Sequence, residues 1–277
     1  IDQILRLLYD ATTHHLYPSG NRSTGERIAL IAVGGYGRGE MAPHSDVDIG
    51  FITPWKPTGW TEQVIESMLY SLWDLGLKVG HSSRSIDETM RMAKSDLTVR
   101  TALLEARYVW GDRALYEETS VRFDAEVMQG NARAFVTEKL VEHTLFWIGK
   151  YVNRVRSVAE LVDVGLLTQI ELRQFQKAED FLWAVRCHLH TITGRAEDRL
   201  TFDLQLETAT RMRFTGRHGQ SGVERFMRYY FLNAKVVGDL TAVFLAHLDD
   251  QMGPKGRRYI PAIFRRPKKL DGFVLDR

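Results

Sequence analysis

This sequence has almost no cysteine, no long apolar segment and no excess of charge of one sign. Cys187 is the only cysteine among the 277 residues, which excludes an internal disulfide and fits the reducing cytoplasm. No uninterrupted apolar run approaches the roughly 18 residues that a membrane-spanning helix needs. The sequence also begins without the basic segment and cleavage site of a signal peptide. We therefore expect a cytoplasmic protein that does not enter a membrane.

The balance of charge argues against a second group of functions. The formal net charge is only +2, from 37 basic and 35 acidic side chains, so it gives no argument for binding nucleic acid. Basic residues gather only near the end, within residues 253–277, where three prolines interrupt them. We expect this range to be a basic linker toward a missing downstream domain. The absence of an initiator methionine likewise suggests that the chain begins inside a longer protein.

The remaining composition is that of a globular protein with a substantial core. Hydrophobic residues make up 44% of the chain and charged residues 26%. The length allows one large or two modest domains. No internal repeat or low-complexity segment is present, so repeat architectures are excluded.

The first part of the chain predicts a small mixed α/β domain. Four glycines within residues 34–39 argue against a regular element there. Gly76 is expected to end a helix, because glycine tolerates the left-handed conformation after a last helical turn. Apolar patterning predicts helices at residues 4–16 and 61–75, and strands at 28–33, 47–53 and 77–81.

Helices dominate the rest of the sequence. Asp96 is expected to cap a helix that runs to Gly111. Further amphipathic helices are predicted at residues 135–155, 169–193 and 221–248. The expected fold class is therefore α+β, a mixed-sheet domain followed by an all-helical domain. The expected limits are residues 1–115 for the first domain, 116–252 for the second, and 253–277 for the linker.

The block of residues 34–48 carries the candidate chemistry. A glycine-rich turn after a buried strand exposes backbone N–H groups and lets a phosphate approach without interference from a Cβ. Asp46 and Asp48 are separated by one residue at the start of a strand, so their carboxylates share one face while Val47 points to the other. Two carboxylates this close repel each other by about 4 kcal/mol at 4 Å and an effective dielectric near 20. A divalent cation would turn this repulsion into an attraction.

This arrangement predicts a metal-dependent nucleotidyltransferase. Magnesium prefers oxygen ligands and binds through one or two carboxylates plus substrate phosphates, so Asp46 and Asp48 are the expected catalytic and metal-binding residues. An isolated Asp-x-Asp or a lone glycine-rich turn is weak evidence, since both occur widely. The order of buried strand, Gly-Gly loop, Ser-Asp-x-Asp and second apolar strand is specific. The residues expected to bind the nucleotide are Gly34, Gly35, Arg38 and Ser45.

That order resembles the signature of the polymerase-β nucleotidyltransferase superfamily. The segments at residues 33–40 and 42–48 are similar to those of the bacterial PII uridylyltransferase/uridylyl-removing family. The resemblance continues through nearly the whole chain. Further similar segments lie at residues 72–81, 95–98, 104–107, 143–148, 179–183, 199–203, 222–227 and 271–275.

The resemblance implies transfer of UMP from UTP to a tyrosine of the regulatory protein PII, with Mg²⁺ or Mn²⁺. In that family the removing and glutamine-sensing functions lie downstream, in a His-Asp phosphohydrolase domain and two ACT domains. No His-Asp dipeptide occurs in this sequence, so removal of UMP is not expected. Two alternatives stay open. They are transfer of AMP to glutamine synthetase or another protein, and a regulatory module that binds nucleotide or PII without turnover.

Two positions depart from related patterns. Many superfamily members carry a third carboxylate where Gly80 stands here, so the catalytic base and any third metal ligand are unassigned. The family also has a glycine-rich stretch that is missing between Glu142 and His143. His81 and Arg84 are candidates for facing the triphosphate. Residues of the helical part that are candidates for contacting the nucleotide are Arg199, Asp203 and Gln205.

Overall fold

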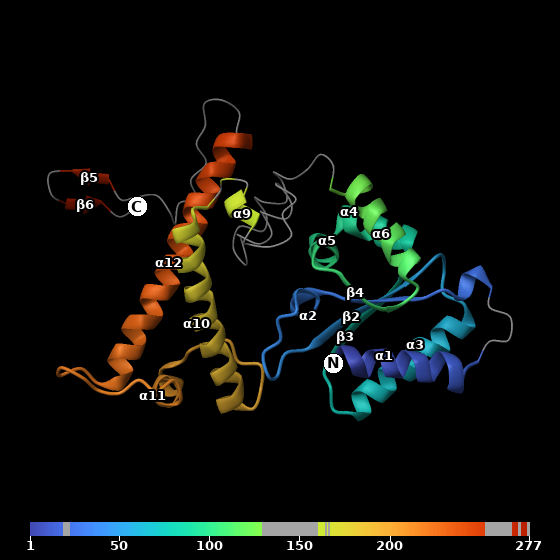
Figure 1. The fold of residues 1–277 in the computed structure, drawn as a ribbon, viewed down its shortest axis with the longest axis horizontal. Helices are drawn as coiled ribbons and strands as arrows, with labels where there is room; N and C mark the ends of the chain where they lie inside the picture. The colour runs from blue at the N-terminus through green and yellow to red at the C-terminus, as the bar shows by residue number, and fades with distance from the viewer. Residues whose placement is uncertain are drawn as a thin grey trace. The chain divides into compact units, whose positions relative to one another are not determined.

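The computed structural model describes most of the chain. The described residues are 1–18, 23–128, 160–163, 165, 167–252, 268–270 and 273–275. The chain divides into two compact units, which are treated separately below (Figure 1). The first unit comprises Ile1–Phe135 and Thr193–Asp198, and the second comprises Val136–Ile192 and Arg199–Arg277.

The first unit is built on a four-stranded mixed sheet. Its strands are β1 (Ala29–Ala32), β2 (Val47–Thr53), β3 (Val79–Ser85) and β4 (Arg107–Gly111), in the spatial order β3-β2-β1-β4. β1 is antiparallel to both of its neighbours, whereas β2 and β3 run parallel. The parallel pair is possible because a helix connects β2 to β3 and returns the chain to the same end of the sheet.

Helices cover both faces of this sheet. Figure 1 shows α1 and α3 on one side, and α4, α5 and α6 on the other. The elements are α1 (Asp2–Ala11), a π-helical turn η1 (Thr12–Leu16), a 3-10 turn η2 (Thr24–Glu26), α2 (Gly34–Arg38), α3 (Gly59–Asp74), α4 (Ile86–Ser95), α5 (Leu97–Leu104) and α6 (Arg113–Glu126). Among the described helices, none is long and apolar enough to cross a bilayer.

The main core lies between the sheet and the α1–α3 layer. Ile49 and Phe51 from β2 pack there with Met68 and Leu72 from α3, and all four are at most 1% exposed. Alternation along β2 sends these side chains to one face and Asp48 to the other. Burial of the strand's apolar side chains therefore fixes the face on which Asp48 lies.

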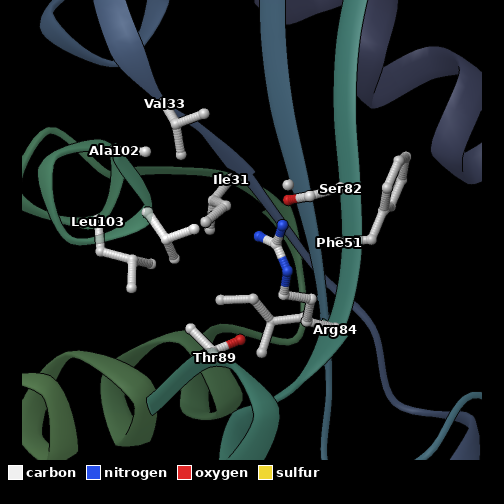
Figure 2. Close-up of a pocket in the computed structure, with 11 residues that line it drawn as sticks. Ile31, Val33, Phe51, Ser82, Arg84, Thr89, Ala102 and Leu103 are labelled. Atoms are coloured by element: carbon white, nitrogen blue, oxygen red, sulfur yellow. The ribbon is translucent and has the colours of Figure 1, made fainter. Parts of the chain in front are cut away.

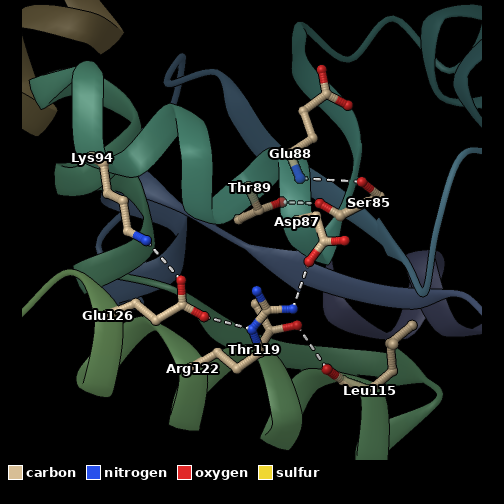
Figure 3. Close-up of polar contacts among 9 residues, drawn as sticks. All are labelled: Ser85, Asp87, Glu88, Thr89, Lys94, Leu115, Thr119, Arg122 and Glu126. Atoms are coloured by element: carbon tan, nitrogen blue, oxygen red, sulfur yellow. Dashed lines mark hydrogen bonds and ion pairs between the residues drawn. The ribbon is translucent and has the colours of Figure 1, made fainter.

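Ion pairs connect the helices of the opposite layer. Arg122 of α6 binds Asp87 of α4 at 2.7 Å and Glu126 at 2.8 Å (Figure 3). Lys94 of α4 reaches the same Glu126 at 2.7 Å. Exposed pairs of this kind are screened by solvent, so they adjust how α4 meets α6 more than they stabilise the fold. The expected domain boundary at residue 115 lies inside α6, whereas the first unit extends beyond it.

The predicted elements of the first unit are confirmed with two exceptions. The strand over residues 47–53 is β2, and Gly76 follows α3 with φ +75°. The expectation of no regular element at residues 34–39 was wrong, because Gly34–Arg38 form one helical turn, α2. The helix expected to run from Asp96 to Gly111 was also wrong. Asp96 caps α5 by accepting from the backbone N–H of Thr98 and Val99, but the chain then enters β4.

The second unit is helical in its larger described part. Its elements are α9 (Glu160–Asp163), α10 (Gln169–Thr193), α11 (Phe202–Arg211), α12 (Gly222–Met252) and the paired strands β5 (Lys268–Leu270) and β6 (Phe273–Leu275). Val185, Leu189, Ala209 and Phe226 form its core, with Phe226 fully buried. α10 confirms the helix predicted at 169–193, and α12 covers the one predicted at 221–248 except for its first residue. The helix predicted at 135–155 lies outside the described residues.

Candidate active site

Asp48 stands at the start of β2 on the sheet face opposite the main core. Its neighbours Val47 and Ile49 are 2% and 1% exposed on the core face, while Asp48 is partly buried on the other. In the parallel register, Asp48 lies beside Gly80 of β3. A Cβ at position 80 would overlap Asp48 Oδ1, so glycine leaves that carboxylate the space it occupies.

Gly34 borders the same carboxylate from the α2 side. Its φ of +60° is a conformation that residues with a side chain rarely adopt. A Cβ at this position would also lie 3.0 Å from Asp48 Oδ2. Two glycines from different elements thus flank the two oxygens of one side chain. The carboxylate occupies a recess between these two glycines.

Electrostatics in this recess oppose a second negative charge. Partial burial raises the pKa of the Asp48 carboxyl, and the charge of the exposed Asp46 raises it further. A cation between the two carboxylates would remove both penalties. The donor set of two carboxylate side chains and open space suits Mg²⁺ or Mn²⁺, whose other ligands would be phosphate oxygens and water. In the part of the chain that the structure describes, no cluster of three or more His, Cys, Asp and Glu side chains is placed to hold a metal.

The glycine-rich segment presents backbone donors next to this recess. α2 begins after Val33, and no side chain caps its start. The first N–H groups of a helix have no intrahelical acceptor, so those of Gly34 and Gly35 are available to a ligand. Gly39 ends the turn with φ +80° and returns the chain toward β2. The glycines here build a tight helical turn, although sequence reasoning treated them as preventing one.

Ser45 shapes the loop that carries Asp46. Its Oγ accepts a hydrogen bond from the backbone N–H of Ala42 at 3.1 Å, and its own N–H donates to the Ala42 carbonyl at 3.0 Å. These two bonds close a turn just before β2. The hydroxyl hydrogen of Ser45 can still be donated to a phosphate, so its role in nucleotide binding stays a prediction.

Arg38 is engaged by carboxylates. Its guanidinium binds Glu40 at 2.7 Å and also pairs with Glu105, whose side chain is only 3% exposed. This pairing joins the end of α2 to the end of α5. Arg38 therefore positions the glycine-rich turn, and a direct contact with nucleotide stays a prediction that would compete with two existing partners. Sequence reasoning missed Glu105, because nothing in the spacing links residues 38 and 105.

Tyr36 ties the same turn to the N-terminal helix. Its hydroxyl donates to Asp2 Oδ1 at 2.5 Å, and Arg107 binds both Asp2 oxygens at 2.7 and 3.1 Å. Arg107 also lies over the Tyr36 ring at 5.3 Å. The hydrogen bond from Arg107 lowers the pKa of Asp2 to about 2, while burial raises the pKa of Tyr36. α2 is thus held by contacts from α1, β4 and α5.

The two candidates on β3 point in opposite directions. His81 pairs with Ile49 in the register, which places it on the face away from Asp48, and its ring meets Trp73 edge-on at 6.0 Å. Arg84 pairs with Ile52 and shares the face of Asp48. Figure 2 shows its side chain inside a cavity between the sheet and α4–α5. Arg84, and not His81, is therefore the β3 side chain on the candidate active-site face.

The candidates of the second unit lie on or next to α11. Asp203 is exposed and Gln205 is partly buried on this helix, and the exposed Arg199 precedes it. Their contact with a nucleotide stays a prediction.

Two family models match separate parts of the chain. The model described as Nucleotidyltransferase domain matches residues 20–109, which contain Asp48, Gly80 and α2. The model described as GlnD PII-uridylyltransferase matches residues 142–245, which contain α10 and α11. The two matches together extend over both structural units.

Relatives with a reviewed name match the chain from end to end. A protein of Novosphingobium aromaticivorans is 58% identical over 305 aligned positions, which cover 100% of this chain and 33% of the relative. The protein of Erythrobacter litoralis is 56% identical, and its alignment covers 93% of this chain and 31% of the relative. That of Rhodospirillum rubrum is 48% identical, and its alignment covers 100% of this chain and 33% of the relative. Each is named "Bifunctional uridylyltransferase/uridylyl-removing enzyme". The chain spans about a third of the length of these relatives.

The first alignment also bears on the missing glycine-rich stretch. It extends over 305 positions although the chain has 277 residues, so the relative carries residues that have no counterpart here. This agrees with a family segment that is absent from the sequence. The place expected for it, between Glu142 and His143, lies outside the described residues.

Proposed function

Because the chain belongs to the nucleotidyltransferase part of the bifunctional uridylyltransferase/uridylyl-removing enzymes, we propose that it transfers UMP from UTP to a tyrosine of PII. The observation that carries the proposal is the recess around Asp48, bordered by Gly34 and Gly80 and next to the start of α2, where no side chain caps the first N–H groups. This recess combines a cation site with phosphate donors. Transfer of a nucleotide from a triphosphate needs both.

The side chains act by positioning and by electrostatics. Asp46 and Asp48 would hold the cation, which would supply neutralisation of the charge on the triphosphate and on the departing pyrophosphate. The N–H groups of Gly34 and Gly35, together with the Ser45 hydroxyl, orient the phosphates. The tyrosine oxygen then forms a bond to the α-phosphorus as the bond to the β-phosphate oxygen breaks. The electron pair leaves with pyrophosphate, and the phenolic proton passes to a base that is not yet assigned.

Magnesium or manganese is the proposed cation, because both accept carboxylate and phosphate oxygens. The proposed setting is the cytoplasm, where UTP is available and a single cysteine stays reduced. No role for nucleic acid is proposed. Transfer of AMP by the same site is the second candidate, since a cation and a triphosphate site do not by themselves select the base.

A direct test combines purified PII with the chain, magnesium and one labelled nucleoside triphosphate at a time. We expect label on PII from UTP and little from ATP, and none in the presence of a chelator. Label from ATP alone would replace uridylyl transfer with adenylyl transfer. Binding of UTP without transfer would support a regulatory module instead. Release of UMP from modified PII is not expected, since no His-Asp dipeptide is present.

A further inference from the structure

The cavity beside Arg84 holds an unexpected combination of groups. It lies between β1–β3 and the helices α4 and α5, and most of its lining is aliphatic, including Ile31, Val99 and Leu103. Its volume is about 40 Å³. That is room for about three water molecules, or for one compact oxyanion, and is too small for a nucleotide base with its ribose.

Two polar groups point into this cavity without a partner in the described part of the chain. The Arg84 guanidinium has no hydrogen bond, ion pair or ring contact there, although the side chain is partly buried. Ser82 also lines the cavity, and no hydrogen bond of its hydroxyl is found among the described residues. Figure 2 shows the guanidinium turned along the sheet toward Ser82 and Ile31. The guanidinium is therefore free to bind an anion that enters the cavity.

The cavity is aligned with the Asp48 recess. Gly80, Ser82 and Arg84 alternate along β3 on the same face, and Gly80 lies beside Asp48. Ser82 lies two residues beyond Gly80, which is a distance of about 6.6 Å along the strand. The Arg84 guanidinium is turned toward Ser82, so both groups lie about this far along β3 from Asp48. The phosphates of a nucleotide whose α-phosphate is at the cation would extend over such a distance.

Selectivity follows from the chemistry of the groups. A guanidinium presents paired N–H donors that match two oxygens of one phosphate, and the serine hydroxyl can add a third donor. Asp48 and Asp46 repel an anion that arrives without a cation. A metal ion can join a diphosphate or triphosphate to the acidic pair. One phosphate then binds the metal, and another binds the guanidinium and the hydroxyl.

The geometry points to an anion subsite formed by Arg84 and Ser82, which holds the terminal phosphate of the nucleotide and then one end of the leaving pyrophosphate. This inference deepens the proposed function and rests on it for the orientation of the nucleotide. It assigns to Arg84 the anchoring role that sequence reasoning gave to Arg38. The two arginines differ in one respect, since Arg38 already has two carboxylate partners.

The test is calorimetric binding of magnesium pyrophosphate and, separately, of magnesium UMP. Arg84→Gln should weaken pyrophosphate by about tenfold or more, because charge-assisted hydrogen bonds are lost. UMP should bind as before, since it lacks the outer phosphates. Ser82→Ala, a small change that keeps the fold, should weaken pyrophosphate severalfold. Arg91→Gln, on an exposed α4 side chain, is the matched control and should change neither affinity.

Unchanged pyrophosphate affinity in both Arg84→Gln and Ser82→Ala would overturn the subsite. Equal weakening of pyrophosphate and UMP would overturn it too, because the cavity would then act through the fold. Asp48→Asn, measured with and without chelator, separates this failure from failure of the proposed function. If Asp48→Asn loses the effect of magnesium while Arg84→Gln leaves the pyrophosphate affinity unchanged, the metal site is supported and the subsite is refuted. If instead Arg84→Gln weakens pyrophosphate binding while Asp48→Asn keeps the effect of magnesium, the anion subsite is supported and the metal site is rejected.

Discussion

Gly80 lies directly beside Asp48 in the parallel register of β2 and β3, in a space where a Cβ would overlap Asp48 Oδ1. Many members of the superfamily carry a third carboxylate at this position. Here Gly80 instead makes room for the carboxylate of Asp48. The absence of a side chain at position 80 is thus part of the geometry on which the proposed metal site depends. This relationship can be tested by adding one methyl group.

Gly80→Ala should remove most UMP transfer while changing stability little. The added methyl group would displace the Asp48 carboxylate from its recess, and β3 as an edge strand tolerates a small side chain. We expect at least a tenfold loss of activity with a melting temperature within a few degrees of the original. Gly59→Ala on α3 is the control, because nothing lies within 4 Å of its added Cβ. Full activity of Gly80→Ala would show that Asp48 does not need this geometry.

Asp48→Asn and Asp46→Asn should nearly abolish transfer without unfolding the metal-free protein. Each substitution removes one charge of a repelling pair and keeps nearly the same shape. Magnesium with UTP should raise the melting temperature of the unaltered protein and barely change that of either variant, because stabilisation requires binding to the folded state. Substantial transfer by both variants would refute the metal role. Unfolding of both without metal would make the pair structural.

The pH dependence of this comparison has a defined sign. The pKa of Asp48 in the folded protein lies above its ordinary value of 3.8, so charging the group costs the metal-free folded state stability. The advantage of Asp48→Asn over the unaltered protein should therefore be absent below pH 3.8. It should grow as the pH rises through the raised pKa and then stay constant. Denaturant titrations at several pH values without metal would measure it.

Asp2→Asn should destabilise the first unit at neutral pH and not in strong acid. The pKa of Asp2 is lowered to about 2, first by its hydrogen bond from Arg107. Its contribution is present above pH 3.8 and is lost as the pH falls toward 2. Because the side chain is about a third exposed, we expect a loss of only about 1 kcal/mol at pH 7. Glu66→Gln, exposed on α3, serves as control, and an equal loss at pH 2 would contradict the ion pair.

Arg38→Gln should lower stability by more than a surface substitution does. It would leave the almost fully buried Glu105 without this cation, which costs about 3 kcal/mol for a buried pair. The double variant Arg38→Gln with Glu105→Gln should recover a measurable part of the loss, as a double-mutant cycle would show. If Arg38 instead served only to bind phosphate, Arg38→Gln would weaken UTP binding and leave unfolding in denaturant unchanged.

The sequence was sufficient wherever a local pattern determined the structure. β2 spans the predicted residues 47–53, and α10 spans the predicted residues 169–193. Both could be predicted because the apolar residues that each element buries form a pattern visible in the sequence. It was insufficient for α2, where tertiary contacts from Asp2, Arg107 and Glu105 stabilise a turn that glycine-rich sequence disfavours. β4 was missed although Tyr108, Val109 and Trp110 favour a strand, because Leu103 and Leu104 extended the helical pattern up to it.

Trp73 shows a second kind of failure. It lies among apolar positions of α3, a pattern typical of core residues, yet it is 43% exposed beside His81 at the sheet edge. For the candidate site, sequence spacing predicted that Asp46 and Asp48 share one face. It could not supply the register of β2 against β3, on which the roles of Gly80 and Arg84 depend. Register is set by the whole sheet and leaves no mark in a short motif.

The central position of β1 has a consequence for how the protein assembles during synthesis. β1 pairs with β2, which follows it closely, and with β4, which begins at residue 107. A nascent chain that has emerged only as far as α3 therefore exposes the unpaired edge of its innermost strand. Contacts so distant in sequence form slowly, and open edges invite association with other chains. Pairing with β4 covers this edge of β1, so a pause in translation before residue 107 should prolong its exposure and lower the yield of folded protein.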